Sequence, residues 1–245
     1  MTAVPTRTLF ALATGFALAL SQPAAADQSD RIVFDVVLKG IKAGELAIDG
    51  KIAGGRYAAN GVVKTTGLAG MLKKIRYDAT ASGSFSKGRF TPRAVEVASQ
   101  RGDDSAKNTM IYKNGTPASV SHEPPREPRP TDVDPAKQGG TIDPLTALYA
   151  VLRDVNRDEA CTLKVTMFDG VRRSQVALSA PQPTENGVTC TGEYRRIAGF
   201  KDREMAEKTR FPFTLTYAPT GDGSRLRVVD ITTDTIIGQG RLTRQ

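Results

Sequence analysis

An alternation of apolar and polar residues with a period of two recurs along most of the chain after residue 30. The clearest case spans residues 75–86, where every second side chain is apolar or small and the intervening ones are polar. Such a pattern is typical of a strand with one buried face. Turns such as Asn114-Gly115 and Asp169-Gly170 supply the positive φ angles that tight hairpins require. The sequence therefore predicts about a dozen strands in succession.

Strands joined mostly by short turns favour an up-and-down antiparallel meander, because consecutive strands usually pair. A sheet of this size must curl to bury its apolar face. We therefore predict a mainly β protein that forms a curled barrel or an open half-barrel. No internal repeat or shift in composition divides residues 27–245, so we expect a single domain there.

One segment follows a helical period instead. Asp143 is a favourable N-cap and Pro144 suits the first helical position. The apolar side chains at helical spacing are Leu145, Leu148, Tyr149 and Leu152. We expect one amphipathic helix near residues 143–154 that plugs or flanks the sheet. The proline-rich stretch near residues 122–140 predicts an extended, exposed loop.

The face of the strand at 75–86 that is expected to point inward carries small residues in its middle. Small side chains leave space, either for the helix to pack or for a ligand. The residues that would line such a cavity are Tyr77, Ala79, Ala81, Gly83, Phe85, Leu148 and Leu152.

The first 26 residues resemble a secretory signal peptide in their order: Arg7, an apolar run at 9–20, and small residues at 24–26. The apolar run is shorter than the roughly 20 residues that a membrane-spanning helix needs. We expect cleavage after Ala26, a periplasmic location, and a mature chain without an integral membrane span.

The chain contains only two cysteines, Cys161 and Cys190, and both lie in segments that read as strands. In an exported protein, two cysteines predict one disulfide. Two separate buried thiols are the alternative, and a redox-active pair is disfavoured because the cysteines lack the Cys-x-x-Cys spacing.

The formal net charge is +8, and it becomes +7 without the leader because Arg7 is the only charged residue there. A basic exported protein favours anionic partners such as lipid head groups, lipopolysaccharide phosphates or cell-wall carboxylates, rather than nucleic acid. The simpler interpretation is that the charge maintains solubility.

A glycine-framed apolar stretch at 67–72 is followed at once by cations. Apolar side chains beside lysines can give weak, reversible association with an anionic membrane. The candidate lipid contacts are Leu68, Met71, Leu72, Lys73, Lys74 and Arg76. In the alternative, Leu68 and Met71 fold back and cap the end of the barrel.

No pattern in the chain predicts a cofactor, a metal site or a catalytic centre. With His122 as the only histidine, a His/Cys metal site lacks the necessary ligands. A Ser-His-Asp triad would have to recruit His122 from the proline-rich loop, and no Gly-x-Ser-x-Gly elbow presents a serine. A pair of carboxylates for glycoside hydrolysis stays open, because several acidic residues lie in expected strands. They are Asp35, Glu45, Asp49, Asp78 and Glu193.

Four short motifs together resemble a known family. They are Phe34-Asp35-Val36, Gly40-Ile41-Lys42-Ala43-Gly44, Thr65-Thr66-Gly67-Leu68-Ala69-Gly70 and Asp143-Pro144-Leu145-Thr146-Ala147-Leu148. The family comprises exported proteobacterial proteins catalogued as the domain of unknown function three-one-zero-eight (DUF3108). The resemblance implies a periplasmic barrel-like or half-barrel domain and brings no catalytic residue.

From these features we expect a non-enzymatic periplasmic protein that supports the cell envelope by binding a lipid or another apolar or anionic envelope component. One alternative is a scaffold that binds another envelope protein through a sheet edge or the proline-rich loop. The other alternative is a carbohydrate-active enzyme.

Overall fold

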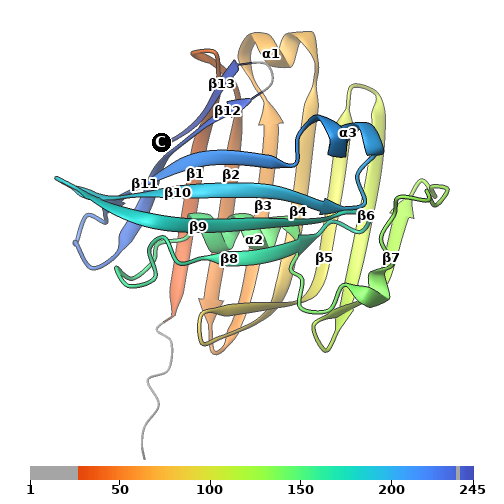
Figure 1. Ribbon diagram of the computed structural model, residues 1–245, viewed down its shortest axis with the longest axis horizontal. Helices are drawn as coiled ribbons and strands as arrows, with labels where there is room; N and C mark the ends of the chain where they lie inside the picture. Colours follow the sequence, from red (N-terminus) through yellow and green to blue (C-terminus); the bar gives the residue numbers. More distant parts are fainter. Residues whose placement is uncertain (1–26, 236–237) are drawn as a thin grey trace, which may run out of the picture.

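The computed structural model describes residues 27–235 and 238–245, so the expected signal peptide at 1–26 lies outside the described residues. Thirteen strands form one sheet (Figure 1). The strands are β1 (Gln28–Leu38), β2 (Ile41–Ala53), β3 (Arg56–Thr65), β4 (Ile75–Ser86), β5 (Arg89–Arg101), β6 (Asp104–Lys113), β7 (Thr116–Glu123), β8 (Lys164–Phe168), β9 (Arg173–Thr184), β10 (Gly187–Ala198), β11 (Arg210–Pro219), β12 (Leu226–Thr235) and β13 (Gly238–Arg244). The helices are α1 (Gly67–Leu72), the short 3-10 helix η1 (Pro135–Lys137), α2 (Pro144–Leu152) and α3 (Asp202–Glu207).

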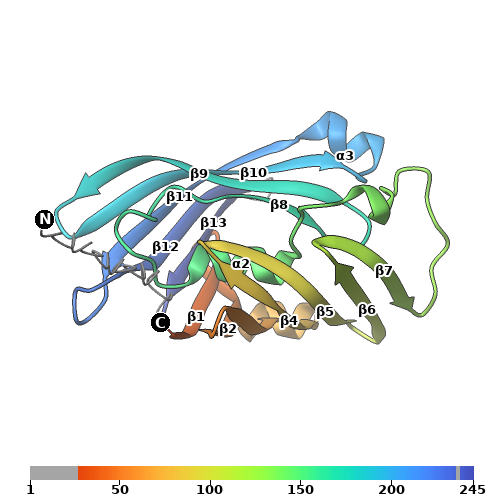
Figure 2. The ribbon, with the colours of Figure 1, turned by 90° about the horizontal axis from the view of Figure 1, so that it is seen from below.

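Every strand pairs antiparallel with its neighbours, in the order β7-β6-β5-β4-β3-β2-β1-β13-β12-β11-β10-β9-β8. The first and last strands therefore meet in the middle of the sheet, where Val36 lies opposite Leu242. The sheet curls into two facing layers with α2 between them (Figure 2). The predicted mainly β meander is confirmed, and the sheet stays open, with β7 and β8 as its edges.

The gap between β7 and β8 is bridged by the segment 131–143. Backbone hydrogen bonds join Val133 N–H to Val171 O at 3.1 Å, Gly140 N–H to Gly115 O at 2.9 Å, Ile142 N–H to Thr166 O at 3.0 Å, and Phe168 N–H to Ile142 O at 2.9 Å. Unpaired groups on a sheet edge need partners, and this segment supplies several of them. The second half of the loop that was expected to be exposed thus connects the two edges of the sheet. We call this segment, residues 131–143, the seam.

Helix α2 begins as its sequence predicts. The Asp143 carboxylate caps the helix by accepting from the Thr146 N–H at 2.9 Å. It also accepts the Thr146 hydroxyl, whose oxygen lies 2.8 Å from the Tyr57 hydroxyl on β3. Asp143 is fully buried, and burial raises the pKa of its carboxyl group. The cap thus fixes the start of α2 inside the sheet.

Two glycines make the recesses that receive α2. A Cβ atom at Gly50 on β2 would lie 2.1 Å from the Tyr149 ring, and one at Gly61 on β3 would lie 2.5 Å from Leu145. Glycine inside a strand is typical of such a close approach. The Tyr149 hydroxyl then donates to Asp30 on β1 at 2.8 Å. The helix therefore plugs the interior through both shape and a buried hydrogen bond.

We predict that Gly50→Ala lowers the free energy of unfolding by about 1–3 kcal/mol, because the new methyl group overpacks against Tyr149. Urea unfolding measures the change. Gly221→Ala is the control, because a Cβ atom there meets open space. Equal losses of stability in the two variants would show that the recess is not tightly filled.

We predict that Asp143→Asn becomes relatively more stable than the native protein as the pH rises. Because burial raises the folded-state pKa of Asp143 above 3.8, its stabilising contribution is present below 3.8 and is lost as the pH rises through the folded pKa. Asparagine also caps helices but carries no charge to bury. Unfolding free energies measured at mildly acidic and at slightly alkaline pH test this, and a pH-independent difference between the two proteins contradicts it.

Candidate functional site: two cavities and an apolar tip

Helix α2 forms part of the walls of two cavities, which we call the upper and the lower cavity. The upper cavity is lined by the end of β12 at residues 233–235, and Figure 1 shows β12 on the side of α1. The β12–β13 hairpin adjoins the β1–β2 turn, where Lys39 N–H donates to Gln239 O at 3.0 Å. The lower cavity is bounded by the turns that follow β4 and β6, at Gly88 and Gly115.

The upper cavity has a volume of about 450 Å³ and a largely apolar wall. Its apolar lining comes from α2 and from β9 to β12. These side chains are Leu148, Val151, Val176, Tyr194, Phe211, Phe213 and Ile231. Leu148 keeps 37% of its surface exposed, which is unusual for a leucine on a helix otherwise buried in the sheet interior. At its edge, Arg196 and Lys208 stand beside Glu207 and Asp234, so the cations and acids balance.

The connection between β3 and β4 carries the short helix α1. The Thr65 hydroxyl accepts from Ile75 N–H at 3.0 Å and donates to Lys73 O at 2.9 Å. In addition, Thr66 N–H donates to Ala43 O at 3.1 Å. These bonds close the connection at its base, so α1 projects from the sheet on a fixed stem.

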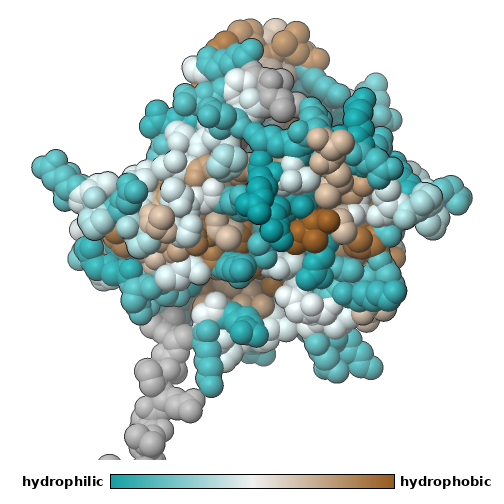
Figure 3. All heavy atoms as spheres, in the orientation of Figure 1, coloured by the Kyte–Doolittle hydropathy of each residue, from teal (hydrophilic) through white to brown (hydrophobic). Residues whose placement is uncertain are grey.

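Four apolar side chains at this end face solvent, and we call them the apolar tip. They are Ile41, Leu68, Met71 and Leu72, with exposed fractions of 59%, 67%, 83% and 88%. Figure 3 shows the resulting apolar surface at the top of the molecule, over α1. Leu68 and Met71 therefore do not fold back to cap the barrel, which excludes that alternative for the described structure. Ile41, which the sequence pattern did not indicate as part of this surface, is brought to the same end by the β1–β2 turn.

The cations that follow α1 differ in their availability. Lys73 and Lys74 are exposed, and within the described residues neither forms an ion pair. Arg76 instead makes a bidentate pair with Asp78 at 2.6 and 2.5 Å. Of the three expected head-group contacts, two lysines are thus free and Arg76 is already neutralised.

The lower cavity is larger, about 1390 Å³. Its deeper wall is mainly apolar and aromatic, and it includes Tyr57, Phe90, Tyr112, Ile142, Val155 and Tyr217. Cations surround it, namely Lys51, Arg56, Lys87, Arg89, Arg93, Arg153 and Lys164. The only acidic side chain in its lining is Glu159.

Arg153, at the end of α2, is the one buried cation of this wall, with 7% of its surface exposed. It donates to Glu159 at 2.5 Å. Burial raises the pKa of Glu159, but the Asn156 N–H and Arg153 outweigh it and hold the pKa of Glu159 below its usual value. The ion pair is therefore formed at neutral pH.

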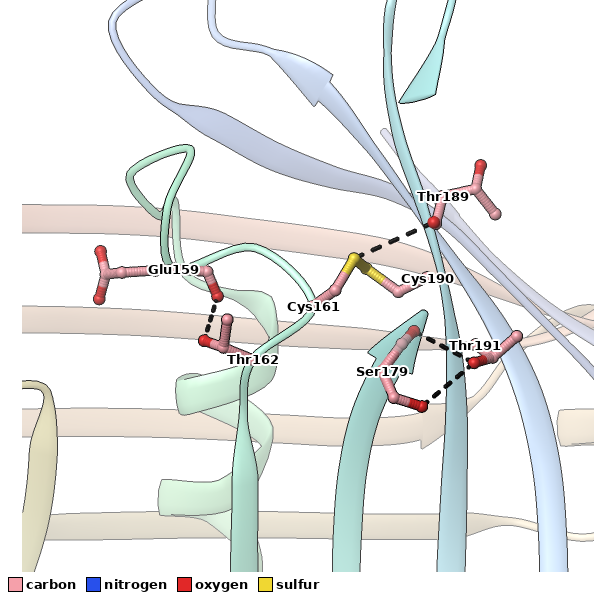
Figure 4. The surroundings of a disulfide bond; sticks show 7 residues. All are labelled: Glu159, Cys161, Thr162, Ser179, Thr189, Cys190 and Thr191. Carbon is pink, nitrogen blue, oxygen red and sulfur yellow. Dashed lines mark hydrogen bonds between the residues drawn. A yellow bond between two sulfur atoms is a disulfide. The ribbon is translucent and has the colours of Figure 1, made fainter. Parts of the chain in front are cut away.

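The disulfide Cys161–Cys190 fastens this wall to the sheet, with 5.4 Å between the Cα atoms (Figure 4). Cys190 lies in β10 as expected, whereas Cys161 lies in a turn with a φ of 61°. The expected strand at Cys161 is wrong because β8 begins only at Lys164. The bond attaches the turn that carries Glu159 and Thr162 to β10.

The residues expected to line a cavity divide among several places. Gly83 lines the lower cavity and Leu148 lines the upper one. Ala81, Phe85 and Leu152 are buried in the core. The other two, Tyr77 and Ala79, are partly exposed on β4 and line neither cavity.

Gly83 has a local reason to be glycine. A Cβ atom there would lie 2.1 Å from the Thr91 carbonyl oxygen on β5. The pairing of β4 with β5 shifts register at this point, which brings the two backbones close. Its small size thus serves the irregular pairing rather than the packing of α2.

The strand carboxylates considered for glycoside hydrolysis lie mostly in ion pairs. Their partners are Lys42 for Asp35 at 2.6 Å, Lys64 for Glu45 at 3.0 Å, Arg76 for Asp78 at 2.5 Å and Arg210 for Glu193 at 3.2 Å. Asp35 and Glu45 are opposite each other, and the lysine hydrogen bonds lower the pKa of both. A general acid in that reaction needs a raised pKa, so this pair does not suit it.

Within residues 27–235 and 238–245, no cluster of three or more potential ligands could hold a metal ion. The helices described there are all too short or too polar to cross a membrane. His122 lies near the seam, with Nδ1 2.6 Å from the Asn108 side-chain oxygen. Burial lowers the pKa of His122.

Fold and site together define a cavity-bearing open β-barrel with an internal helix. The family model described as "Protein of unknown function (DUF3108)" matches residues 33–197, so the chain belongs to this family. The resemblance seen in the sequence is confirmed.

Among solved structures, the chain is similar to a beta-barrel-like protein of the domain of unknown function DUF1849 from Brucella abortus. The two share 12% identity with a TM-score of 0.50, over 89% of this chain and 95% of that one. The likeness supports the barrel-like fold alone. No curated protein matches the chain significantly.

Proposed function

We propose that this protein is a non-enzymatic lipid-binding protein of the periplasm that supports the cell envelope. The observation that carries the proposal is the apolar tip on α1, which lies on the same side of the molecule as β12, a strand that lines an apolar cavity. A folded chain rarely exposes neighbouring large apolar side chains in water without a partner surface.

The tip suits the interface of an anionic bilayer. Met71 and Leu72 are more than four-fifths exposed and can enter the apolar zone, while Lys73 and Lys74 meet the head groups. Each lysine near an anionic surface contributes about 1 kcal/mol of attraction. With only two lysines and one short helix, the association is weak and reversible.

The upper cavity suits one acyl chain. At about 30 Å³ for each water-sized group, its volume of about 450 Å³ holds roughly 15 such groups, as many as the methylenes of one lipid chain. Its lining of leucine, valine and aromatic side chains offers apolar contacts along that length. The tip would then place the cavity beside the membrane from which the lipid comes.

We predict that Leu68→Ser/Met71→Ser lowers the fraction of protein that floats with anionic vesicles by at least about tenfold. Losing two membrane contacts removes about 1.5–3 kcal/mol for each fully buried side chain. Ile111→Ser is the control, because Ile111 is 43% exposed outside the tip. Equal flotation of the tip variant and the native protein would refute docking through the tip.

We predict that gently purified protein carries a lipid that native mass spectrometry detects, and that Leu148→Glu loses it. A carboxylate in the apolar cavity opposes an acyl chain, and its own desolvation is costly. Leu148 is partly exposed, so the fold should tolerate the change. Ile111→Glu adds the same charge elsewhere and should keep the lipid; retention of the lipid by Leu148→Glu would contradict the proposal.

A further inference from the structure

We infer that the lower cavity is a second, separate binding site, for a phosphorylated amphiphile. Its phosphate would meet the cations at the rim and its apolar portion would lie on the aromatic wall. The inference does not rest on lipid docking at the tip, because α2 stands between this cavity and the upper one.

Six of the seven cations that line the cavity are exposed and form no ion pair within the described part of the chain. They are Lys51, Arg56, Lys87, Arg89, Arg93 and Lys164. The acid in the lining, Glu159, is already paired with Arg153. Like charges gathered around a concave, low-dielectric wall create a field that attracts anions.

Some cations elsewhere on the same strands are paired with acids. On the walls of the sheet, cations such as Lys42, Lys64 and Lys107 each meet a carboxylate within 3.0 Å. The chain has 26 acidic residues, enough to provide partners more widely. Seven cations and one acid line the lower cavity, whereas the whole chain has 34 cations and 26 acids, so the excess of cations there is local and exceeds the overall basic charge.

The cations approach the cavity from different elements. Lys87 lies in the turn between β4 and β5, and Lys164 begins β8. In the strand register, Lys51 lies beside Ala58, and Ala58 lies beside Ser82. Gly50 faces Tyr149 inside the sheet, so Lys51 points to the outer face and borders the cavity from there. A ligand at the rim could therefore be contacted from several elements of the fold.

The floor contains a donor without a partner. The Nε atom of Arg153 is buried and makes no hydrogen bond in the described structure. A buried donor left unsatisfied is costly, and because Nε is closed to water here, an acceptor oxygen reaches it only when the neighbouring side chains move apart. The other Arg153 nitrogens are occupied by Glu159, Gln28 and the Asp154 carbonyl, so the guanidinium is held in place in the wall of the cavity.

The size of the lower cavity and the chemistry of its wall indicate a ligand larger than a free anion such as phosphate. The volume of about 1390 Å³ exceeds the roughly 300–1,000 Å³ of common small-molecule pockets. The wall behind the cations is apolar and aromatic, with Tyr57, Phe90 and Tyr217 buried there. A head group bearing phosphate, joined to an apolar portion, uses both parts of the cavity.

The test is isothermal titration of the purified protein with dihexanoyl phosphatidic acid kept below its micelle concentration. We expect saturable binding that weakens as salt is added, because ion pairing drives it. Lys87→Gln/Lys164→Gln should weaken binding by at least about tenfold. The control Lys73→Gln/Lys74→Gln removes the same charge at the α1 end and should bind like the native protein.

Four outcomes would overturn the inference. The first two are the absence of saturable binding and an equal loss of affinity in the two double variants. The third is that inorganic phosphate binds as tightly as the amphiphile. The fourth is that an acidic peptide displaces the amphiphile as effectively as unlabelled amphiphile does. The failure of the proposed function is recognised separately. Lys73→Gln/Lys74→Gln should reduce vesicle flotation and leave the affinity for the amphiphile unchanged. Lys87→Gln/Lys164→Gln should reduce the affinity for the amphiphile and leave vesicle flotation unchanged.

Discussion

The insertion of α2 into the curled sheet is the constraint on which the remaining structure depends. Tyr149 fills the recess at Gly50 and donates its hydroxyl to Asp30 on the first strand. At the start of the helix, Asp143 is wholly buried and accepts a hydrogen bond from the Thr146 N–H. A buried carboxylate and a buried phenol are tolerated only when hydrogen-bonded, so these contacts fix the position of the helix and not only its presence.

The helix also explains why the sheet does not close. The chain must leave β7, enter the interior as α2, and return to the surface before β8 begins at Lys164. A direct pairing of β7 with β8 would seal the entrance. The segment 131–143 instead lies in the gap and bonds to both sides through Gly140 and Ile142. The open seam is therefore the consequence of an internal helix in a meander whose two ends pair at β1 and β13.

The features that could be predicted from the sequence are those that depend on residues close together in the chain. The period of two and the glycine turns gave the antiparallel sheet, and Asp143-Pro144 gave the start of α2. Helices α1 and α3 were not predicted, because six residues are too few to display a helical period. For Cys161, the nearby strand pattern outweighed any turn signal, and the turn became visible only in the structure.

The cavities could not be predicted from local patterns, because their walls come from distant parts of the chain. Lys51, Lys87 and Lys164 meet around one space only after the meander has curled. Ile41 likewise reaches the apolar tip through the β1–β2 turn. The sequence offered only its basic net charge as a signal. That charge indicates an anionic partner but does not show where on the protein the partner binds.

The same short helix forms part of both cavity walls and thereby limits what each can hold. Leu148 and Val151 face the upper cavity, while Ala150 and Arg153 face the lower one. Enlarging either space by moving α2 would pull Tyr149 from Asp30 and Asp143 from its buried partners. Breaking such buried bonds costs about 1–3 kcal/mol for each group left unsatisfied. The sizes of the two spaces are thus set by the anchoring of α2, so each ligand must fit a wall that cannot easily move.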